Sequence, residues 1–184
     1  MDALLTFIGY EAVWFAAVSG AGHGRVWPGL GAAAAFIGWR MWASTARGVE
    51  LRLLAVASLI GAMLETLWVR TGLIHYSAAW PLASAPAWLM ALWASFGLTI
   101  RPLFGWLETR PWLAAVLGAV GGPLSYWAAS RGWHAVRFPP QPWGSLAALA
   151  LGWAAALPLL TSLSSHWQGS RGAHREPRHE RRTG

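Results

Sequence analysis

Six long apolar stretches follow one another along the chain, and they limit the folds that it can adopt. Each approaches the ~20 residues that a helix needs to cross the hydrocarbon core of a bilayer. They are expected at Leu4–Gly20, Val26–Trp42, Leu51–Val69, Ala85–Ile100, Trp112–Ser130 and Trp143–Ser164. These runs are too continuously apolar and too rich in Ala for the alternating strands of a membrane β-barrel. The sequence therefore predicts an all-α, polytopic transmembrane helix bundle of six spans, of which the second and fourth are short.

The composition indicates lipid surroundings. Of the 184 residues, 55% are hydrophobic and only 11% are charged, against roughly 25% charged in an ordinary soluble domain. The net charge of +7 comes entirely from arginines, and these are spread as flanking residues or gathered near the C-terminus. They do not form the continuous basic face that nucleic-acid binding requires. We therefore expect membrane lipids, and no nucleic acid, as partners.

The arginine distribution also predicts an orientation. In a six-span arrangement, ten of the 14 arginines fall on the side of the two termini and four on the other side. Because cytoplasmic loops are enriched in Arg and Lys, both termini are expected in the cytoplasm. The N-terminus lacks the basic region of a signal peptide and is interpreted as a retained first span. Abundant Ala, Gly and Arg are typical of a GC-rich bacterial genome, so we expect a multi-pass protein of the bacterial inner (plasma) membrane.

Two regions are expected within the chain. Residues 1–165 form the six-helix transmembrane domain. Residues 166–184 are polar, basic and without apolar periodicity, which predicts a disordered cytoplasmic tail. Within the spans, small residues recur at the spacing of helix contacts, including Ala57 to Gly61 and Gly118 to Gly122, and they predict tight helix association.

Glu11 and Glu65 are the acids that fall inside predicted spans. An ionised carboxylate at mid-membrane costs about 2.5–3.5 kcal/mol on insertion scales, so such residues usually face the bundle interior or water. Both are therefore candidate catalytic residues. The alternative for Glu11 is a protonated packing residue. The alternative for Glu65 is an ion pair with an Arg from a neighbouring helix end.

Glu65 shares a helical stripe with small and polar residues, which favours an inward-facing position. In the expected orientation it lies in the periplasmic half, where several residues suited to binding gather. The predicted polar pocket faces the periplasm and consists of Glu65, Arg70, His75, Tyr76, Trp93, Tyr126 and Arg131. Core packing is the alternative for Trp93.

The sequence contains no motif of a known catalytic or metal centre. HExxH, GxSxG and P-loop patterns are absent, and there is no Cys. His, Asp and Glu do not cluster at ligand spacing within a span. We therefore expect no metal and no cofactor.

Four segments carry a resemblance to a known family: GYEAVWFAAVSGA, GAMLETLWVRTGLIHY, APAWLMALWASFGLTIR and GAVGGPLSYWAASRGWHAVRF. Together they resemble a family of small, Trp-rich proteobacterial inner-membrane proteins classed as a domain of unknown function, over about residues 4–164. Some members are encoded near fatty-acyl modifying enzymes of the cyclopropane-synthase type. The resemblance implies a connection to membrane lipids, and it transfers no catalytic residue.

The sequence leaves several functions open. Our first hypothesis is a lipid-associated accessory or binding protein. One alternative is a membrane-embedded enzyme that acts on an acyl or isoprenoid lipid, with Glu11 or Glu65 as general acid or base. Others are a small proton-coupled transporter and a structural subunit of a membrane complex, with a second copy of the chain or another membrane protein as partner.

Overall fold

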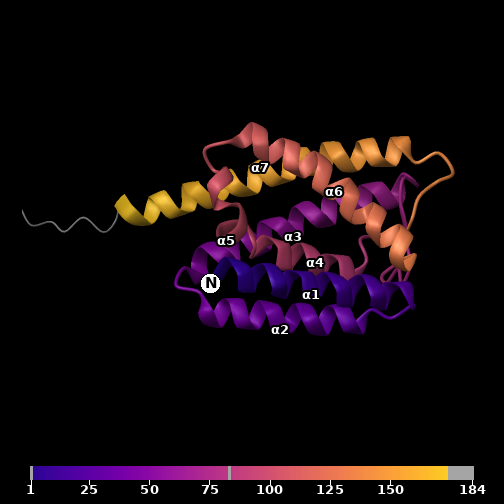
Figure 1. Cartoon of the computed structure of the whole chain (residues 1–184), viewed down its shortest axis with the longest axis horizontal. Coiled ribbons are helices and arrows are strands. Elements are labelled where there is room, and N and C mark those ends of the chain that lie inside the picture. The colour runs from indigo at the N-terminus through magenta and orange to yellow at the C-terminus, as the bar shows by residue number, and fades with distance from the viewer. Residues whose placement is uncertain (1, 83, 174–184) are drawn as a thin grey trace, which may run out of the picture.

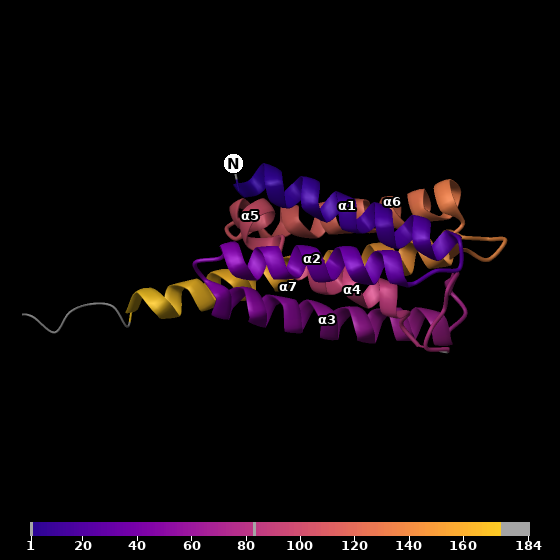
Figure 2. The ribbon, with the colours of Figure 1, turned by 90° about the horizontal axis from the view of Figure 1, so that it is seen from below.

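The computed structural model describes residues 2–82 and 84–173 and confirms an all-helical fold. The helices are α1 (Asp2–Gly22), α2 (Trp27–Ala43), α3 (Arg47–Arg70), α4 (Ala87–Gly97), α5 (Ile100–Phe104), the short 3₁₀ helix η1 (Gly105–Leu107), α6 (Pro111–Trp133) and α7 (Trp143–Ala173). The long helices lie roughly side by side, and the chain runs back and forth along the bundle (Figures 1 and 2). The N-terminus and the described end of α7 lie at one end of the bundle, which we call the terminal end.

The number of spans is smaller than expected when each helix is judged by itself. Four helices, α1, α3, α6 and α7, are long and apolar enough to cross a membrane. A fifth span results if α4 and the α5–η1 segment, bent by 52° relative to each other, count as one. The helix α2 has 17 residues, fewer than the ~20 that a straight crossing needs. The six-span count is therefore not confirmed.

The fourth expected stretch is broken because its backbone changes direction after Gly97. The Thr99 hydroxyl donates to the carbonyl of Phe96 over 2.7 Å, a local bond that competes with helix continuation. Gly97 also lies so close to α3 that a Cβ there would stand 2.7 Å from the Leu53 carbonyl oxygen. This contact fixes the C-terminal end of α4 against the first half of α3.

A short antiparallel pair of strands closes the opposite end of the bundle, which we call the hairpin end. Strand β1 (His75–Tyr76) pairs with β2 (Val136–Arg137), with Tyr76 opposite Val136. Side chains alternate across a strand, so Tyr76 points into the bundle while His75 is exposed. The pairing joins the segment after α3 to the segment after α6.

Glycines allow the close helix contacts that the small-residue spacings predict. A Cβ at Gly118 would overlap the backbone carbonyl of Trp153, and a Cβ at Gly122 would overlap the Trp153 ring. Gly61 of α3 leaves room in the same way for the ring of Trp93 on α4. In consequence α6 packs along α7 and α3 along α4, whereas α6 has few contacts with α1.

The C-terminal helix continues past the expected end of the bundle. α7 extends to Ala173, so the segment 166–173, expected within a disordered tail, is helical. The rest of the predicted tail, residues 174–184, lies outside the described residues.

Candidate functional site

Glu65 is the centre of a buried hydrogen-bond cluster near the hairpin end. It lies on α3, one turn after Gly61, and is fully buried. Its carboxylate accepts hydrogen bonds from the hydroxyls of Tyr76 and Tyr126 and, over 2.9 Å, from the indole Nε1 of Trp93. These donors come from β1, α6 and α4. Four of the seven predicted binding residues therefore meet around one carboxylate.

The bonds satisfy a group that is otherwise costly to bury. An unpaired carboxylate in an apolar interior is strongly unfavourable, and hydrogen bonds to a charged group are among the stronger ones in proteins. Burial, followed by the charge of Glu65, raises the pKa of the Tyr76 hydroxyl well above its usual value, so the hydroxyl stays protonated and donates. The expected alternative, an ion pair between Glu65 and an Arg, does not occur among the described residues.

The structure does not bring the other three predicted binding residues to Glu65. Arg70 and His75 are exposed at the hairpin end. Arg131 is also exposed, and its guanidinium lies over the ring of Trp127, 4.6 Å from the ring centre. Long charged side chains near helix ends keep their charged groups in water. Closeness in sequence to the buried cluster therefore does not bring them to Glu65.

Two members of the Glu65 cluster also form the wall of a cavity, which we call the aromatic chamber. Its volume is about 40 Å³, and Trp93 and Tyr126 line it. Five of its eleven other lining residues are also aromatic: Tyr10, Trp14, Trp88, Phe96 and Trp153. By holding the Trp93 indole and the Tyr126 ring, Glu65 fixes the chamber wall without lining the chamber itself.

Beside the chamber, between α1 and α6, lies a larger depression, which we call the α1–α6 groove. Its volume is about 460 Å³. The groove and the chamber share five residues, Tyr10, Trp14, Phe96, Ser125 and Trp153. The groove exists because α6 follows α7 closely through Gly118 and Gly122 while contacting α1 sparsely.

Glu11 lines this groove, so the two candidate acids occupy different positions. Glu11 is half-buried on the groove, whereas Glu65 lies behind the chamber wall. An acid–base role on a bound lipid therefore fits Glu11 better than Glu65, whose oxygens are already engaged by three donors.

Trp153 is a site residue that the sequence indicates only as a deeply placed Trp. Its ring stacks on that of Trp93, with 4.4 Å between ring centres and 14° between planes. Its indole Nε1 is buried without a hydrogen-bond partner among the described residues. Its depth in the last apolar stretch could be read from the sequence, but its contact with Trp93 depends on helix packing.

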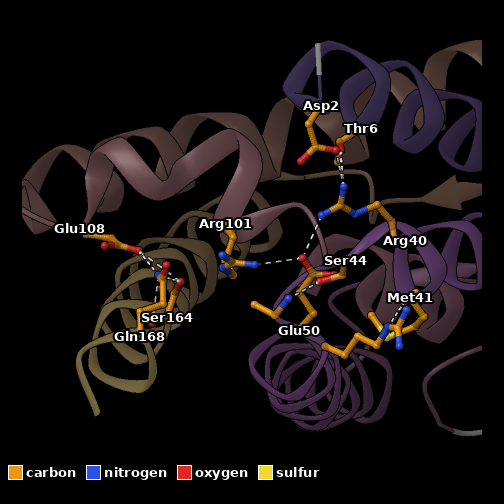
Figure 3. Close-up of polar contacts among 12 residues, drawn as sticks. Asp2, Thr6, Arg40, Met41, Ser44, Glu50, Arg101, Glu108, Ser164 and Gln168 are labelled. Atoms are coloured by element: carbon orange, nitrogen blue, oxygen red, sulfur yellow. Dashed lines mark hydrogen bonds and ion pairs between the residues drawn. The ribbon is translucent and has the colours of Figure 1, made fainter. Parts of the chain in front are cut away.

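A second polar cluster lies at the terminal end, and no sequence pattern predicts it. Arg40 is 3% exposed on α2 and donates to Asp2 (2.7 Å), Thr6 (3.0 Å) and Glu50 (2.9 Å). Arg101 of α5 donates to the same Glu50 oxygen over 3.2 Å. Figure 3 shows these side chains pointing toward one another from α1, α2, α3 and α5.

This ion-pair network borders a polar cavity of about 380 Å³. Glu108 and Gln168 also line it, joined by a 3.1 Å hydrogen bond from the Gln168 amide. Two arginines are balanced by Asp2, Glu50 and Glu108, so the cavity carries no excess of positive charge. Within the described residues, no group of three or more His, Cys, Asp or Glu is placed to hold a metal ion.

Comparison with known proteins identifies one family. Residues 3–159 match the profile of a family described as "Protein of unknown function (DUF2878)". No curated protein and no solved structure matches the chain.

Proposed function

We propose that this chain, which belongs to the DUF2878 family, is a lipid-binding accessory protein that holds one apolar lipid chain in the α1–α6 groove. The observation that carries the proposal is the size of the groove and its mostly apolar lining, part of which it shares with the aromatic chamber. The groove runs between apolar helices and is bordered by aromatic rings, which offer large apolar contact area. Concave, mostly apolar sites with a few polar groups are typical of small-molecule binding.

The proposal places the bundle in the bacterial inner membrane with six passes. The alternating direction of α1, α2, α3, the bent α4–α5 pair, α6 and α7 supports six passes, with α2 as a short one. The distribution of arginines supports a cytoplasmic terminal end and a periplasmic hairpin end. The groove then opens from the side of the bundle, where a lipid chain enters from the bilayer.

Gly121 provides a way to fill the groove without disturbing helix packing. It lines the groove on α6, and a Cβ there would meet nothing within 4 Å. In Gly121→Phe the phenyl ring occupies space that the proposal assigns to the lipid chain. We expect lipid retained per protein to fall roughly tenfold, which corresponds to about 1.4 kcal/mol of lost binding. Native mass spectrometry with lipidomics on protein extracted in mild detergent measures this ratio.

The matched control is Gly31→Phe on α2. A Cβ at Gly31 also meets nothing within 4 Å, and α2 contributes no lining residue to the groove. This variant should retain lipid as the wild type does. Equal lipid retention in the wild type and in a folded Gly121→Phe variant contradicts the proposed function.

A further inference from the structure

We infer that the ligand of the α1–α6 groove is a long-chain alcohol, with its chain among the aromatic rings and its hydroxyl between Glu11 and Trp153. This inference rests on the proposed function and names the chemical class of the lipid. It follows from the polar groups on the groove wall and from their depth in the bundle.

The depth of these groups argues against an ordinary phospholipid tail as the specific ligand. Glu11 stands nine residues after the first residue of α1, about 14 Å along the helix, and therefore near its middle. In a bilayer whose hydrocarbon core is about 30 Å thick, phospholipid tails present only hydrocarbon at that depth. A polar wall there is complemented by a ligand that brings its own polar group to the same level.

The hydrogen-bonding capacity of the wall specifies that group. The Trp153 indole donates, and its Nε1 has no partner among the described residues. Ser125 Oγ already accepts from Trp14 Nε1 over 3.0 Å, so its own hydrogen remains available to donate. Glu11 supplies carboxyl oxygens that accept. A hydroxyl both accepts and donates, so it complements this set.

Other common head groups fit less well. A hydrocarbon end leaves the Trp153 donor unsatisfied, and an ether oxygen accepts but offers Glu11 no hydrogen. A fatty-acid carboxylate places a second negative charge beside the carboxyl group of Glu11. The alcohol alone among these four meets both the donor and the acceptor of the wall.

Three probes of equal chain length test the inference: oleyl alcohol, oleyl methyl ether and cis-9-octadecene. An equimolar mixture is added to the full-length protein in mild detergent, and native mass spectrometry gives the ratio of the bound probes. We expect about fivefold more alcohol than ether, and about fivefold more ether than hydrocarbon, since each step adds one net hydrogen bond. Equal binding of the three probes, or a reversed order, overturns the inference.

Single substitutions test which residue is responsible for each preference between two probes. Glu11→Ala should abolish the preference for alcohol over ether, whereas Glu11→Gln keeps an accepting oxygen and should preserve it. Trp153→Phe should abolish the preference for ether over hydrocarbon. Trp153 packs on Trp93 and Gly118, so Trp153→Phe can fail to fold. In that case the probe ratios of the wild type, Glu11→Ala and Glu11→Gln test the inference. Alcohol preference that survives in folded Glu11→Ala overturns the assigned geometry.

The Gly121→Phe variant distinguishes a failure of the alcohol inference from a failure of the proposed function. Equal binding of all probes to the wild type, lost in Gly121→Phe, overturns the alcohol inference and leaves the groove as a chain-binding site. Probe binding that Gly121→Phe does not reduce contradicts the groove itself.

Discussion

Replacing Glu65 with alanine is expected to lower the free energy of unfolding by at least about 3 kcal/mol. The change removes the common acceptor of Tyr76, Tyr126 and Trp93 from a fully buried position. Each buried donor left without a partner costs about 1–3 kcal/mol, and the deleted side chain leaves a cavity as well. Unfolding of purified protein in mixed dodecyl maltoside and SDS micelles measures the difference.

Glu65→Gln is the matched control because it keeps the shape of the side chain. The Gln amide oxygen can accept from Tyr126 and Trp93, which share one carboxylate oxygen in the native protein. Its amide nitrogen can donate to the Tyr76 oxygen. Glu65→Gln should therefore lose much less stability than Glu65→Ala. Equal stability of Glu65→Ala and the wild type contradicts a structural role for the cluster, and equal damage by both substitutions shows that the negative charge itself is needed.

The Glu65 cluster shows how far helical periodicity can predict a site. The stripe on the third apolar stretch identifies Glu65 as inward-facing, and Gly61, Glu65 and Trp68 are all buried. Tyr76 is predicted in the same pocket because the expected orientation places it, like Glu65, in the periplasmic half. The β1–β2 pairing that turns Tyr76 inward is only two residues long and carries no apolar pattern that a sequence could display.

The α1–α6 groove was not predictable from the sequence. Periodicity indicates which face of a helix is buried, but a groove depends on the distances between helices. Gly118 and Gly122 set one such distance by admitting Trp153, and their spacing is common in a chain rich in Ala and Gly. Glu11 is predicted as a candidate because it is an acid inside an apolar span. Its position on the groove wall depends on how the helices pack.

The burial of Arg40 could not be predicted from hydropathy, for a physical reason. Arg40 lies in the last turn of the second apolar stretch, which is expected to end at Trp42, and the apolar pattern gives no sign that the arginine has buried partners. In the structure Arg40 is buried because Asp2, Thr6 and Glu50 surround its guanidinium. These partners come from three segments that no local pattern relates to one another.

Replacing Arg40 with methionine is expected to destabilise the protein by about 3–5 kcal/mol, the cost of breaking a buried ion pair from one side. Met fills similar space without charge, so the loss reflects the electrostatic change more than a cavity. Glu50, 1% exposed, then keeps Arg101 as its ion-pair partner, and Thr6 loses a bond in a buried position. The same unfolding measurement applies, with Asp2→Asn as the control. Asp2 is 66% exposed in its side chain, so its ion pair contributes at most about 1 kcal/mol.

A double substitution separates the ion pair from simple loss of packing. In Arg40→Met combined with Glu50→Met, both charges of the buried pair disappear, and Arg101, which is 25% exposed, is left for solvent to hydrate. Replacing a whole buried pair with apolar side chains is often neutral. The double variant should therefore be more stable than Arg40→Met alone. If the two residues acted independently, the second substitution would lower the free energy of unfolding further. If the two losses simply add, Arg40 and Glu50 act independently, and the network does not hold the terminal ends of α2 and α3 together as the geometry indicates.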